Sequence, residues 1–471
     1  MHTEYRDILL RDMTPQDIAD EIRWNTTQTE WGDWDAPWET EETFRTYDMA
    51  AHRQRLEAFL QRPKPEIRRS LEIEVNGVHI GTVSAYAMDA GCCPAKDGPY
   101  LALGLDICES QLWGQGLGKR ALTAWILYFL GHGQGELYLQ TWSGNVRMIR
   151  AAERLGFREF RRKPRLRQVR GAVYDALTFR LDLALFHRYL LEENLRSLAL
   201  TESTVQATLA CYDCRPGYHQ RHSALAYAGQ VPNFPINRLP PLERLVVWGC
   251  RLTQVRQRYQ DMGIPYPVVE NTLADIALRA RLYTAKTGKP GLSKADGIWF
   301  RHLDNQCIFR LGSLQFQRFS MVYLDKGGCG EDWMTFDPAV KEQLPPGQPV
   351  INVHVQRGAD LSPQAVADSL HQAEKFFATH FPECRWFLCY SWLLYPGMEA
   401  LLPAGSNILA FSRGFQIIGQ ANDPAGAIGQ IYGRRYPRKA DYPQDTALQR
   451  AALGKFSRLG WGCGIRPVGR P

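Results

Sequence analysis

Apolar and polar positions along the chain repeat with two different periods, which predicts a fold that mixes helices and strands. Residues 101–108 form a nearly continuous apolar run, as expected for a buried strand. A turn with three glycines follows, and apolar positions then recur at helical spacing over residues 117–130. Another apolar strand is predicted over residues 136–142, and a helix begins at Asn145. This order of strand, turn, helix, strand and helix organises the first part of the chain.

The segments around this unit complete a first domain, which we place at residues 1–185. A helix is predicted to begin at Thr14-Pro15, because threonine is a good cap and proline fits a first turn. Asn76-Gly77 is the preferred two-residue turn of a hairpin. Further strands are predicted at residues 6–10, 67–74, 79–87 and 174–183.

The second half predicts a mainly helical segment at residues 186–304 and a second α/β domain at 305–471. Amphipathic patterns cover residues 242–262 and 269–283. In the second domain a helix runs from Pro363 to residue 377, with Ser362 as its cap. Strands are predicted there at residues 308–311, 314–324, 350–355 and 385–392.

The turn before residue 117 has the composition of a phosphate-binding loop. A helix start offers unpaired backbone N–H groups and a partial positive charge, so an anion can bind there. Gly114, Gly116 and Gly118 let the backbone approach such an anion without a Cβ atom in the way. The sequence therefore predicts a phosphate cradle at this turn.

Two common phosphate loops fit this turn poorly. A Walker loop ends in Gly-Lys-Ser/Thr, but here Arg120 follows Lys119, and Trp113 stands where the first glycine belongs. A dinucleotide-binding turn has the spacing Gly-x-Gly-x-x-Gly and an acid about 20 residues further on. This chain has Gly-x-Gly-x-Gly, and its next strand ends in Gln140-Thr141-Trp142.

Residues 113–118 read Trp-Gly-Gln-Gly-Leu-Gly, and the helix led by Asn145 ends in Leu155-Gly156-Phe157. These stretches resemble motifs A and B of the GNAT superfamily of acyl-CoA-dependent N-acyltransferases. The Trp-Gly-x-Gly form resembles the branch that acetylates ribosomal-protein N-termini, polyamines and antibiotics. The resemblance implies that the loop backbone binds the pyrophosphate of acetyl-CoA and that the parted strand after it receives the pantetheine arm. The implied cofactor-binding residues are Ile107, Cys108, Trp113, Gly114, Gln115, Gly116, Leu117, Gly118, Lys119 and Asn145.

Four tryptophans interleave with acids over residues 24–39, in a segment that covers the acceptor site in the superfamily. Aromatic faces together with carboxylates suit a cation. The predicted acceptor-binding residues are Trp31, Asp33, Trp34, Asp35, Trp38 and Glu39. The acceptor would then be a cationic amine such as a polyamine, an aminoglycoside-like compound or a peptide N-terminus. The alternative is a surface loop whose tryptophans only fill gaps against the sheet.

Transfer to an amine requires a base. An alkylamine has a pKa near 10, so releasing its proton at pH 7 costs about 4 kcal/mol unless a base accepts it. Glu109, at the end of the cofactor strand, is the predicted base, and its alternative is a surface acid near a helix. Ser143 is the candidate acid that reprotonates the CoA thiolate, since no obvious tyrosine follows Phe157.

Residues from 186 onward resemble bacterial acyltransferase-domain proteins with a helical first part and a divergent GNAT-like C-terminal part. The matching stretches are residues 352–358, 389–394 and 406–408. His354, on the second cofactor strand, is a candidate base because an imidazole has a pKa of about 6.5, and its alternative is a core histidine. The glycine loop is missing here. Cys389 is predicted to be packed core, not a thiol relay.

The composition narrows the class of protein. A chain of 471 residues predicts two or three domains, and a net charge of +7 is too mild to indicate nucleic-acid binding. Eleven cysteines without regular spacing predict free thiols, a reducing cytoplasm and no metal site, although Cys211 and Cys214 form one C-x-x-C. The start of the chain lacks a signal-peptide pattern, and no apolar run reaches the length of a membrane span.

These observations predict a cytoplasmic α/β protein with two GNAT-like mixed-sheet domains in tandem, the second preceded by a mainly helical segment. It would transfer an acetyl or acyl group from CoA to a small-molecule or peptide amine by direct attack, without a metal, a membrane or a nucleic-acid partner. A homodimer is compatible with this prediction. The alternative is a single active N-terminal acetyltransferase with a non-catalytic C-terminal ligand-sensing or scaffolding domain.

Overall fold

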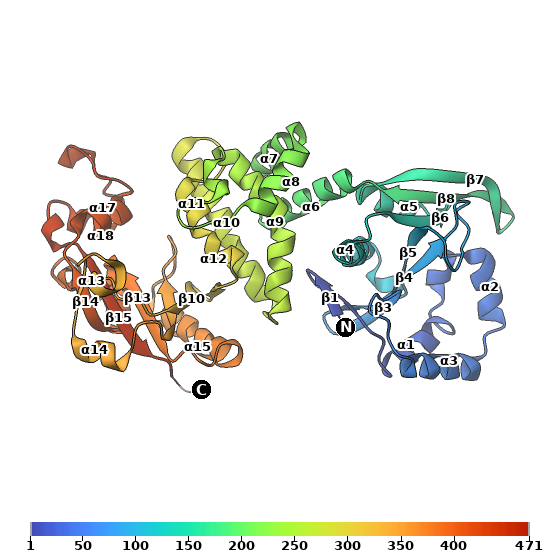
Figure 1. Cartoon of the computed structure of the whole chain (residues 1–471), viewed down its shortest axis with the longest axis horizontal. Helices are drawn as coiled ribbons and strands as arrows, with labels where there is room; N and C mark the ends of the chain where they lie inside the picture. The colour runs from blue at the N-terminus through green and yellow to red at the C-terminus, as the bar shows by residue number, and fades with distance from the viewer. Residues whose placement is uncertain (1, 470–471) are drawn as a thin grey trace. The chain divides into compact units, whose positions relative to one another are not determined.

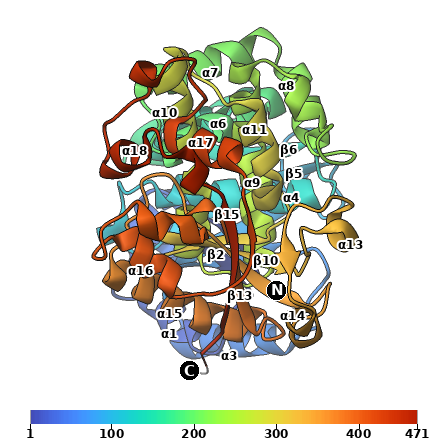
Figure 2. The ribbon, with the colours of Figure 1, turned by 90° about the vertical axis from the view of Figure 1, so that its left-hand side faces the viewer.

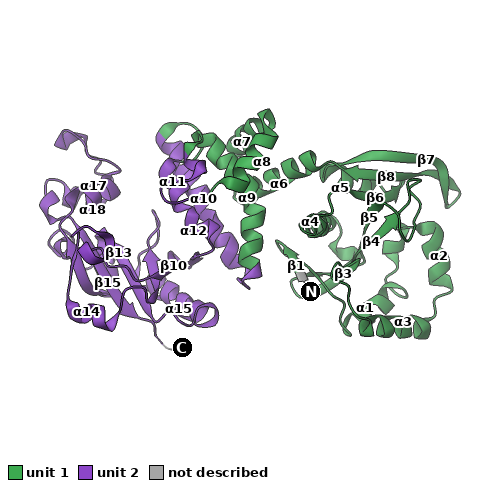
Figure 3. Cartoon of the chain, in the orientation of Figure 1, with its two compact units in different colours: residues 1–228, 238–260, 287–292 green, residues 229–237, 261–286, 293–471 purple. Residues whose placement is uncertain are grey.

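The structure is a computed structural model that describes residues 2–469, and Figure 1 shows the course of the chain. The chain divides into two compact units, shown in Figure 3. Unit 1 contains Met1–Ala228, Arg238–Gln260 and Thr287–Leu292, and unit 2 contains Gly229–Asn237, Asp261–Lys286 and Ser293–Pro471. Each unit holds one mixed β-sheet, so the predicted fold class is confirmed. No described helix has the length and hydropathy that a membrane span requires.

The sheet of unit 1 has eight strands in the order β1-β2-β3-β4-β5-β6-β8-β7. Their bounds are β1 (His2–Tyr5), β2 (Ile8–Arg11), β3 (Ser70–Val75), β4 (Val78–Met88), β5 (Tyr100–Ile107), β6 (Leu137–Trp142), β7 (Phe157–Val169) and β8 (Ala172–Leu181). The single strand predicted at residues 6–10 is instead a turn of the β1–β2 hairpin followed by most of β2, because Arg6 has a φ of 60° and reverses the chain.

The strands β5 and β6 are the parallel pair of this sheet, and they part along their length. Their pairing runs from Leu101–Leu137 to Leu103–Leu139 and then stops. Beyond that point β5 continues to Ile107 and β6 to Trp142. An opening between two strands therefore lies at their carboxyl ends, directly before the predicted cradle.

The helices of unit 1 connect and follow the strands of its sheet. Their bounds are α1 (Asp17–Trp24), η1 (Glu30–Asp33), α2 (Pro37–Arg45), α3 (Met49–Gln61), η2 (Ser110–Leu112), α4 (Leu117–Gly131), α5 (Val146–Arg154), α6 (Leu183–Ser197), α7 (Glu202–Cys214), α8 (Pro216–Leu225) and most of α9 (Pro241–Asp261). The central helix α4 is buried along most of its length, and Trp125 is fully buried against β4, where its indole N–H donates to the Ser84 carbonyl at 2.9 Å. Burial of such a large apolar surface fixes α4, and with it the cradle, on the sheet.

The sheet of unit 2 has seven strands in the order β11-β14-β15-β13-β12-β10-β9, and Figure 2 turns β13 and β15 toward the viewer. Their bounds are β9 (Ile308–Leu311), β10 (Leu314–Ser320), β11 (Thr335–Phe336), β12 (Pro349–His354), β13 (Trp386–Ser391), β14 (Gln416–Ala421) and β15 (Trp461–Pro467). The parallel pair is β12–β13, and its pairing ends at Asn352–Leu388 although both strands continue. Unit 2 thus has its own parted parallel pair.

The helices of unit 2 precede and connect these strands. Their bounds are η3 (Pro235–Arg238), α10 (Tyr266–Thr287), α11 (Lys294–Trp299), α12 (Arg301–Asp304), α13 (Lys326–Cys329), α14 (Pro338–Gln343), α15 (Pro363–His380), η4 (Trp392–Leu394), η5 (Pro396–Ala400), α16 (Asn407–Arg413), α17 (Pro424–Tyr432), η6 (Lys439–Asp441), α18 (Ala447–Ala452) and η7 (Phe456–Arg458). The last residue of η3 belongs to unit 1, as does the last residue of α10. The helical segment predicted between the two sheets exists, and its helices are divided between the units.

Candidate functional site

The phosphate cradle lies where the chain turns into α4. Gly114 and Gly116 have φ angles of 82° and 74°, which residues with a side chain rarely adopt. In the part of the chain that the structure describes, the backbone N–H groups of residues 114–119 have no hydrogen-bond partner. They therefore form a row of unpaired donors at the positive end of a long helix, which is the arrangement that binds phosphate groups.

A cavity of about 610 Å³ extends from the cradle into the opening between β5 and β6. One wall is β5 from Leu103 to Ile107, and the opposite wall is Gln140 and Thr141 of β6 together with α5. Eight of the ten residues predicted to bind the donor line this cavity. The exceptions are Cys108, which is buried in the core, and Gln115, whose side chain points back toward the Gln111 carbonyl.

Positive charge gathers along the α5 side of the cavity. The guanidinium of Arg147 lies between two indoles, 4.1 Å from the ring centre of Trp34 and 4.6 Å from that of Trp113. Arg150 and Arg154 also line the cavity, are exposed, and form no ion pair within residues 2–469. These cations suit a phosphorylated ligand that enters beside the cradle.

The side chains of β5 alternate between the side that faces α4 and the side that faces away from it. A Cβ atom on Gly118 of α4 would lie 3.1 Å from Leu105 and 3.7 Å from Ile107, so these two side chains face α4. Because side chains alternate along a strand, Gly104 and Asp106 face the opposite side. Trp31, Trp34 and Asp35 also line the cavity.

Part of the tryptophan-rich segment lines the cavity, and part of it packs elsewhere on the domain. Trp31, Trp34 and Asp35 line the cavity, whereas Asp33, Trp38 and Glu39 do not. Asp33 pairs with Arg170. Trp38 packs edge-on against Trp142 with ring centres 6.2 Å apart, and its N–H donates to Glu39 at 3.0 Å. Half of the predicted acceptor residues therefore reach the cavity, and the other half hold the segment against the domain.

Asn145 links this segment to α5. Its side-chain oxygen accepts from the Met148 N–H at 3.0 Å and so caps the helix. Its amide N–H donates to the Trp34 carbonyl at 2.5 Å, and the Trp142 indole donates to the same carbonyl at 3.2 Å. Asn145 thus lines the cavity and also fixes the position of Trp34.

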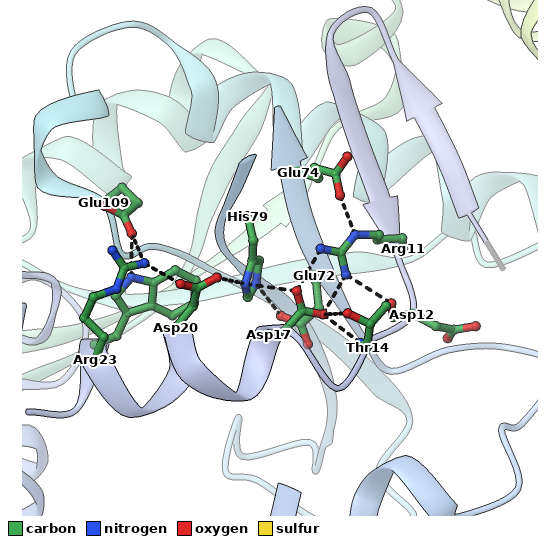
Figure 4. A network of polar contacts seen from close by, with 11 residues as sticks. Arg11, Asp12, Thr14, Asp17, Asp20, Arg23, Glu72, Glu74, His79 and Glu109 are labelled. Carbon is green, nitrogen blue, oxygen red and sulfur yellow. Dashed lines mark hydrogen bonds and ion pairs between the residues drawn. The ribbon is translucent and has the colours of Figure 1, made fainter. Parts of the chain in front are cut away.

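Glu109 is not among the residues that line the cavity, and Figure 4 shows its contact with Arg23. One carboxylate oxygen accepts from the Arg23 guanidinium at 2.7 Å and from the Trp24 indole at 2.9 Å, and the other accepts from Gln111 at 2.6 Å. Burial alone would raise the pKa of Glu109, but these hydrogen bonds and the charge of Arg23 outweigh it, so the pKa is lowered. This geometry ties α1 to the turn before the cradle.

The network around Glu109 continues through α1 to the sheet (Figure 4). His79 on β4 lies between Asp20 at 3.1 Å and Glu72 at 3.0 Å. Arg11 on β2 contacts Asp17 at 2.7 Å. The network therefore anchors α1, the helix that leads into the tryptophan-rich segment, to three strands.

Ser143 lies away from the groove. Its hydroxyl accepts from the Asp175 N–H at 3.0 Å, and it lines a separate cavity of about 310 Å³ on the other side of α5. The structure therefore does not bring Ser143 together with the cradle residues.

In unit 2, His354 stands at the end of β12, beyond the last β12–β13 pair. Its Nε2 is 2.8 Å from the Gln317 carbonyl oxygen, and the Gln317 amide nitrogen is 3.0 Å from Nδ1 of His302. An amide oxygen only accepts, so Nε2 of His354 carries the hydrogen and Nδ1 keeps the lone pair. Burial and the nearby charges of His302, Arg279 and Arg301 lower the pKa of His354 to about 3, so the ring is neutral at neutral pH.

Two further features of unit 2 bear on its predicted site. Cys389 is buried within β13, and burial raises the pKa of its thiol, so it is a packed core residue. A cavity of about 350 Å³ lies between α15 and α16 and is lined in part by Leu361, Pro363 and Arg466.

Asp106 also lines the cavity, and the sequence analysis did not single it out. It stands inside an apolar run, between Leu105 and Ile107, where the pattern predicts buried strand positions. The signal that could have found it is an acid in a continuous apolar strand, because an acid there faces either a partner or a ligand.

Comparisons with known proteins agree with this architecture. Residues 7–158 match the model of the acetyltransferase (GNAT) domain, and residues 308–462 match the model of the GNAT-like C-terminal domain. No curated protein matches the chain.

Solved acyltransferase structures have partly similar folds. One is an acyltransferase in complex with decanoyl-CoA and teicoplanin, with 23% identity over 58% of this chain and 86% of that one and a TM-score of 0.44. A GNAT-family acetyltransferase from Bacillus anthracis shows 11% identity over 38% of this chain and 98% of that one, with a TM-score of 0.30. RimL, a ribosomal L7/L12 alpha-N-protein acetyltransferase in complex with coenzyme A, shows 13% identity over 38% and 97%, with a TM-score of 0.31. The two domain matches and the two mixed sheets show that the chain contains an N-terminal GNAT acetyltransferase domain and a GNAT-like C-terminal domain.

Proposed function

We propose that unit 1 transfers an acyl group from acyl-CoA to a primary amine. The observation that supports this most strongly is the row of unpaired N–H groups at residues 114–119, which opens directly into the gap between β5 and β6. A parted parallel pair offers unpaired strand edges to an extended ligand, and the helix start offers its donors to phosphates.

The residues of the cavity fit an acyl-CoA donor. The cradle N–H groups would hold the pyrophosphate, and Arg150 and Arg154 would pair with phosphate charge. The unpaired edges of β5 and β6 would hold the pantetheine arm, whose amides can hydrogen-bond to a strand. The donor supplies an activated thioester carbonyl, and these residues would hold that carbonyl in place for attack.

The acceptor would approach from the opposite face of β5. Trp31, Trp34 and Asp35 line the same cavity and combine aromatic faces with a carboxylate. Such a lining suits an ammonium group. The acceptor is therefore a small-molecule or peptide amine that is cationic in solution.

A screen of donors against acceptors tests this function. The full chain is incubated with acetyl-CoA and longer acyl-CoAs against polyamines, aminoglycosides and peptides, and free thiol is followed over time. The proposal expects amine-dependent release of CoA with at least one pair. Absence of release with every pair, together with absence of acyl-CoA binding by calorimetry, contradicts it.

We also infer that unit 2 carries a second acyl site. The supporting observation is a second parted parallel pair with a neutral imidazole, His354, where the strands separate. The hydrogen bond to Gln317 leaves the lone pair of His354 on Nδ1, where it can accept a proton, but the lowered pKa makes this imidazole a weaker base than an ordinary histidine. The competing reading is a ligand-sensing or scaffolding unit that regulates unit 1.

A further inference from the structure

Two carboxyl groups on the acceptor side of the unit 1 groove lack partners. Asp106 and Asp35 both line the cavity, and within the described residues neither carboxyl group has a hydrogen-bond or ion-pair partner. Asp35 is exposed, and the Asp106 carboxyl is not among the buried polar groups that lack a partner, so both carboxyl groups are accessible. Nearby acids differ from them, since Asp17 pairs with Arg11 and Glu109 with Arg23. Carboxylates that are left unpaired beside aromatic rings are suited to a cationic ligand.

The groups around Asp106 are acidic. Asp35 lies near it from the segment after η1, Glu21 from α1, and the Cys108 thiol from the residue that directly follows β5. Burial raises the pKa of Asp106 well above its ordinary value, and the charges of Asp35 and Glu21 raise it further. A carboxyl group with a raised pKa accepts a proton more readily than an ordinary aspartate, and a general base must accept a proton.

We propose that Asp106 is the general base of the acyl transfer and that Asp35 binds the ammonium group of the acceptor. This inference rests on the proposed function of unit 1. It also specifies the acceptor: a primary amine that arrives protonated, because an uncharged nucleophile would not require two carboxylates.

The reaction balances with these two groups. Asp35 holds the ammonium at the cavity, and Asp106 takes one proton from it. The amine nitrogen then forms a bond to the thioester carbonyl carbon, and the carbon–sulfur bond breaks with its electron pair on sulfur. The second proton leaves the nitrogen for the thiolate, so the products are an amide, free CoA and a protonated Asp106 that returns its proton to water. No other reactant is needed.

Glu109 does not compete for the role of base. Its two oxygens already accept three hydrogen bonds, it lies outside the cavity lining, and its pKa is lowered. Asp106 differs on each of these points, although only two positions separate the residues along the chain.

The test compares Asp106→Asn and Asp35→Asn with Asp97→Asn, a control on the exposed turn before β5 that lies outside the cavity lining. With an alkylamine acceptor, we expect Asp106→Asn to lower kcat by about 100-fold or more. The variant should also lose the acid limb of the pH profile, which is the decrease of kcat/KM at low pH as the base becomes protonated. With a hydrazide, whose conjugate acid has a pKa of about 3, the same variant should lose less than about tenfold, because no proton has to leave before attack. Asp35→Asn should raise the KM for the alkylamine about tenfold while changing kcat little.

The outcomes separate the two proposals. If the wild-type chain releases no CoA with any amine, the proposed function fails. The assignment of Asp106 is wrong if the wild-type chain is active and Asp106→Asn keeps both the rate and the acid limb. It is also wrong if Asp106→Asn loses the same factor in activity with the alkylamine and with the hydrazide. Calorimetry with acetyl-CoA checks that the variant is folded. Should it not fold, the wild-type chain still provides the test, because an acid limb with the hydrazide equal to that with the alkylamine overturns the assignment.

Discussion

Gly116 is the residue on which the cradle depends most. Its φ of 74° is left-handed, and a side chain there costs about 1 kcal/mol of backbone strain. Gly133, beyond the other end of α4, has a φ of 76° and open space around it. Substitution of Gly133 therefore causes the same backbone strain at a position outside the cradle, which makes it a matched control. We expect Gly116→Ala to weaken acetyl-CoA binding by about tenfold, or about 1.4 kcal/mol, and Gly133→Ala to leave it unchanged. Calorimetry measures both, and equal weakening in the two variants would contradict the role of the cradle.

Glu109 gives a second prediction at this scale. Glu109→Gln loses the charge that holds Arg23 and Trp24, so we expect the free energy of unfolding to fall by about 1–3 kcal/mol. Because the base is assigned elsewhere, the acid limb of the rate profile should stay. Urea unfolding and the pH profile of the variant test this, and a lost acid limb in a fully stable variant would restore Glu109 as the base.

These residues could be predicted from the sequence only where their interaction partners lie close to them along the chain. The cradle was readable because glycine spacing and a helix start are local features. The pairing of Glu109 was not, since its partners Arg23 and Trp24 lie 86 and 85 positions away. Asp106 was hidden because its environment is set by Asp35 and α1, which only the folded sheet brings near.

At the scale of elements, folding raises the pKa values of two groups where α1 meets the sheet. Burial alone would lower the pKa of His79, but its hydrogen bonds to Glu72 and Asp20 and the charges of Glu72 and Asp17 raise the pKa above its ordinary value of 6.5. Burial raises the pKa of Glu21 to about 7, and Glu72 adds to the shift. Both groups therefore bind protons more tightly in the folded than in the unfolded state.

These shifts predict that unit 1 loses stability as pH rises. The contribution of Glu21 is lost between pH 4.5 and about 7, and that of His79 is complete below 6.5 and is lost as pH rises through its raised pKa. We expect the urea midpoint of wild type to fall over this range and the fall to be smaller in His79→Gln and in Glu21→Gln. A pH dependence that is identical in wild type and both variants would contradict the account of α1.

The tryptophan-rich segment shows why element type was harder to predict than element order. Its sequence predicted contact with a cation, and part of it does line the cavity. The structure folds it into η1 and α2 because Thr40 donates to the Gly32 carbonyl at 3.0 Å and Asn145 holds Trp34. Neither contact is visible from the spacing of aromatic and acidic residues.

At the scale of the whole molecule, the two sheets followed from the alternation of strand and helix patterns. The proposed boundaries at residues 185 and 304 remain predictions, because the compact units divide the helical segment between them. Helices pack through contacts between residues that lie far apart in the sequence, and a sequence pattern does not show these contacts. One example is Asn194 of α6, whose side chain donates to the Gly249 carbonyl of α9 at 2.9 Å.

The number of acyl sites distinguishes the tandem enzyme from the sensor. If unit 2 is a second transferase, His354→Asn should lower transfer from its preferred acyl-CoA by about 100-fold and leave the acetyl transfer of unit 1 unchanged. Gly116→Ala should instead weaken the use of acetyl-CoA by unit 1 by about tenfold and leave transfer by unit 2 unchanged. A donor screen with both variants measures this, and a His354→Asn chain that keeps every activity would favour the sensing or scaffolding role.

The central claim is that the backbone N–H groups of residues 114–119 bind the pyrophosphate of the donor. Amide hydrogen exchange of the full chain with and without saturating acetyl-CoA tests this directly. The account predicts slower exchange at residues 114–119 on binding, with much smaller changes at Gly133. Binding of acetyl-CoA without any slowing at the cradle would contradict it.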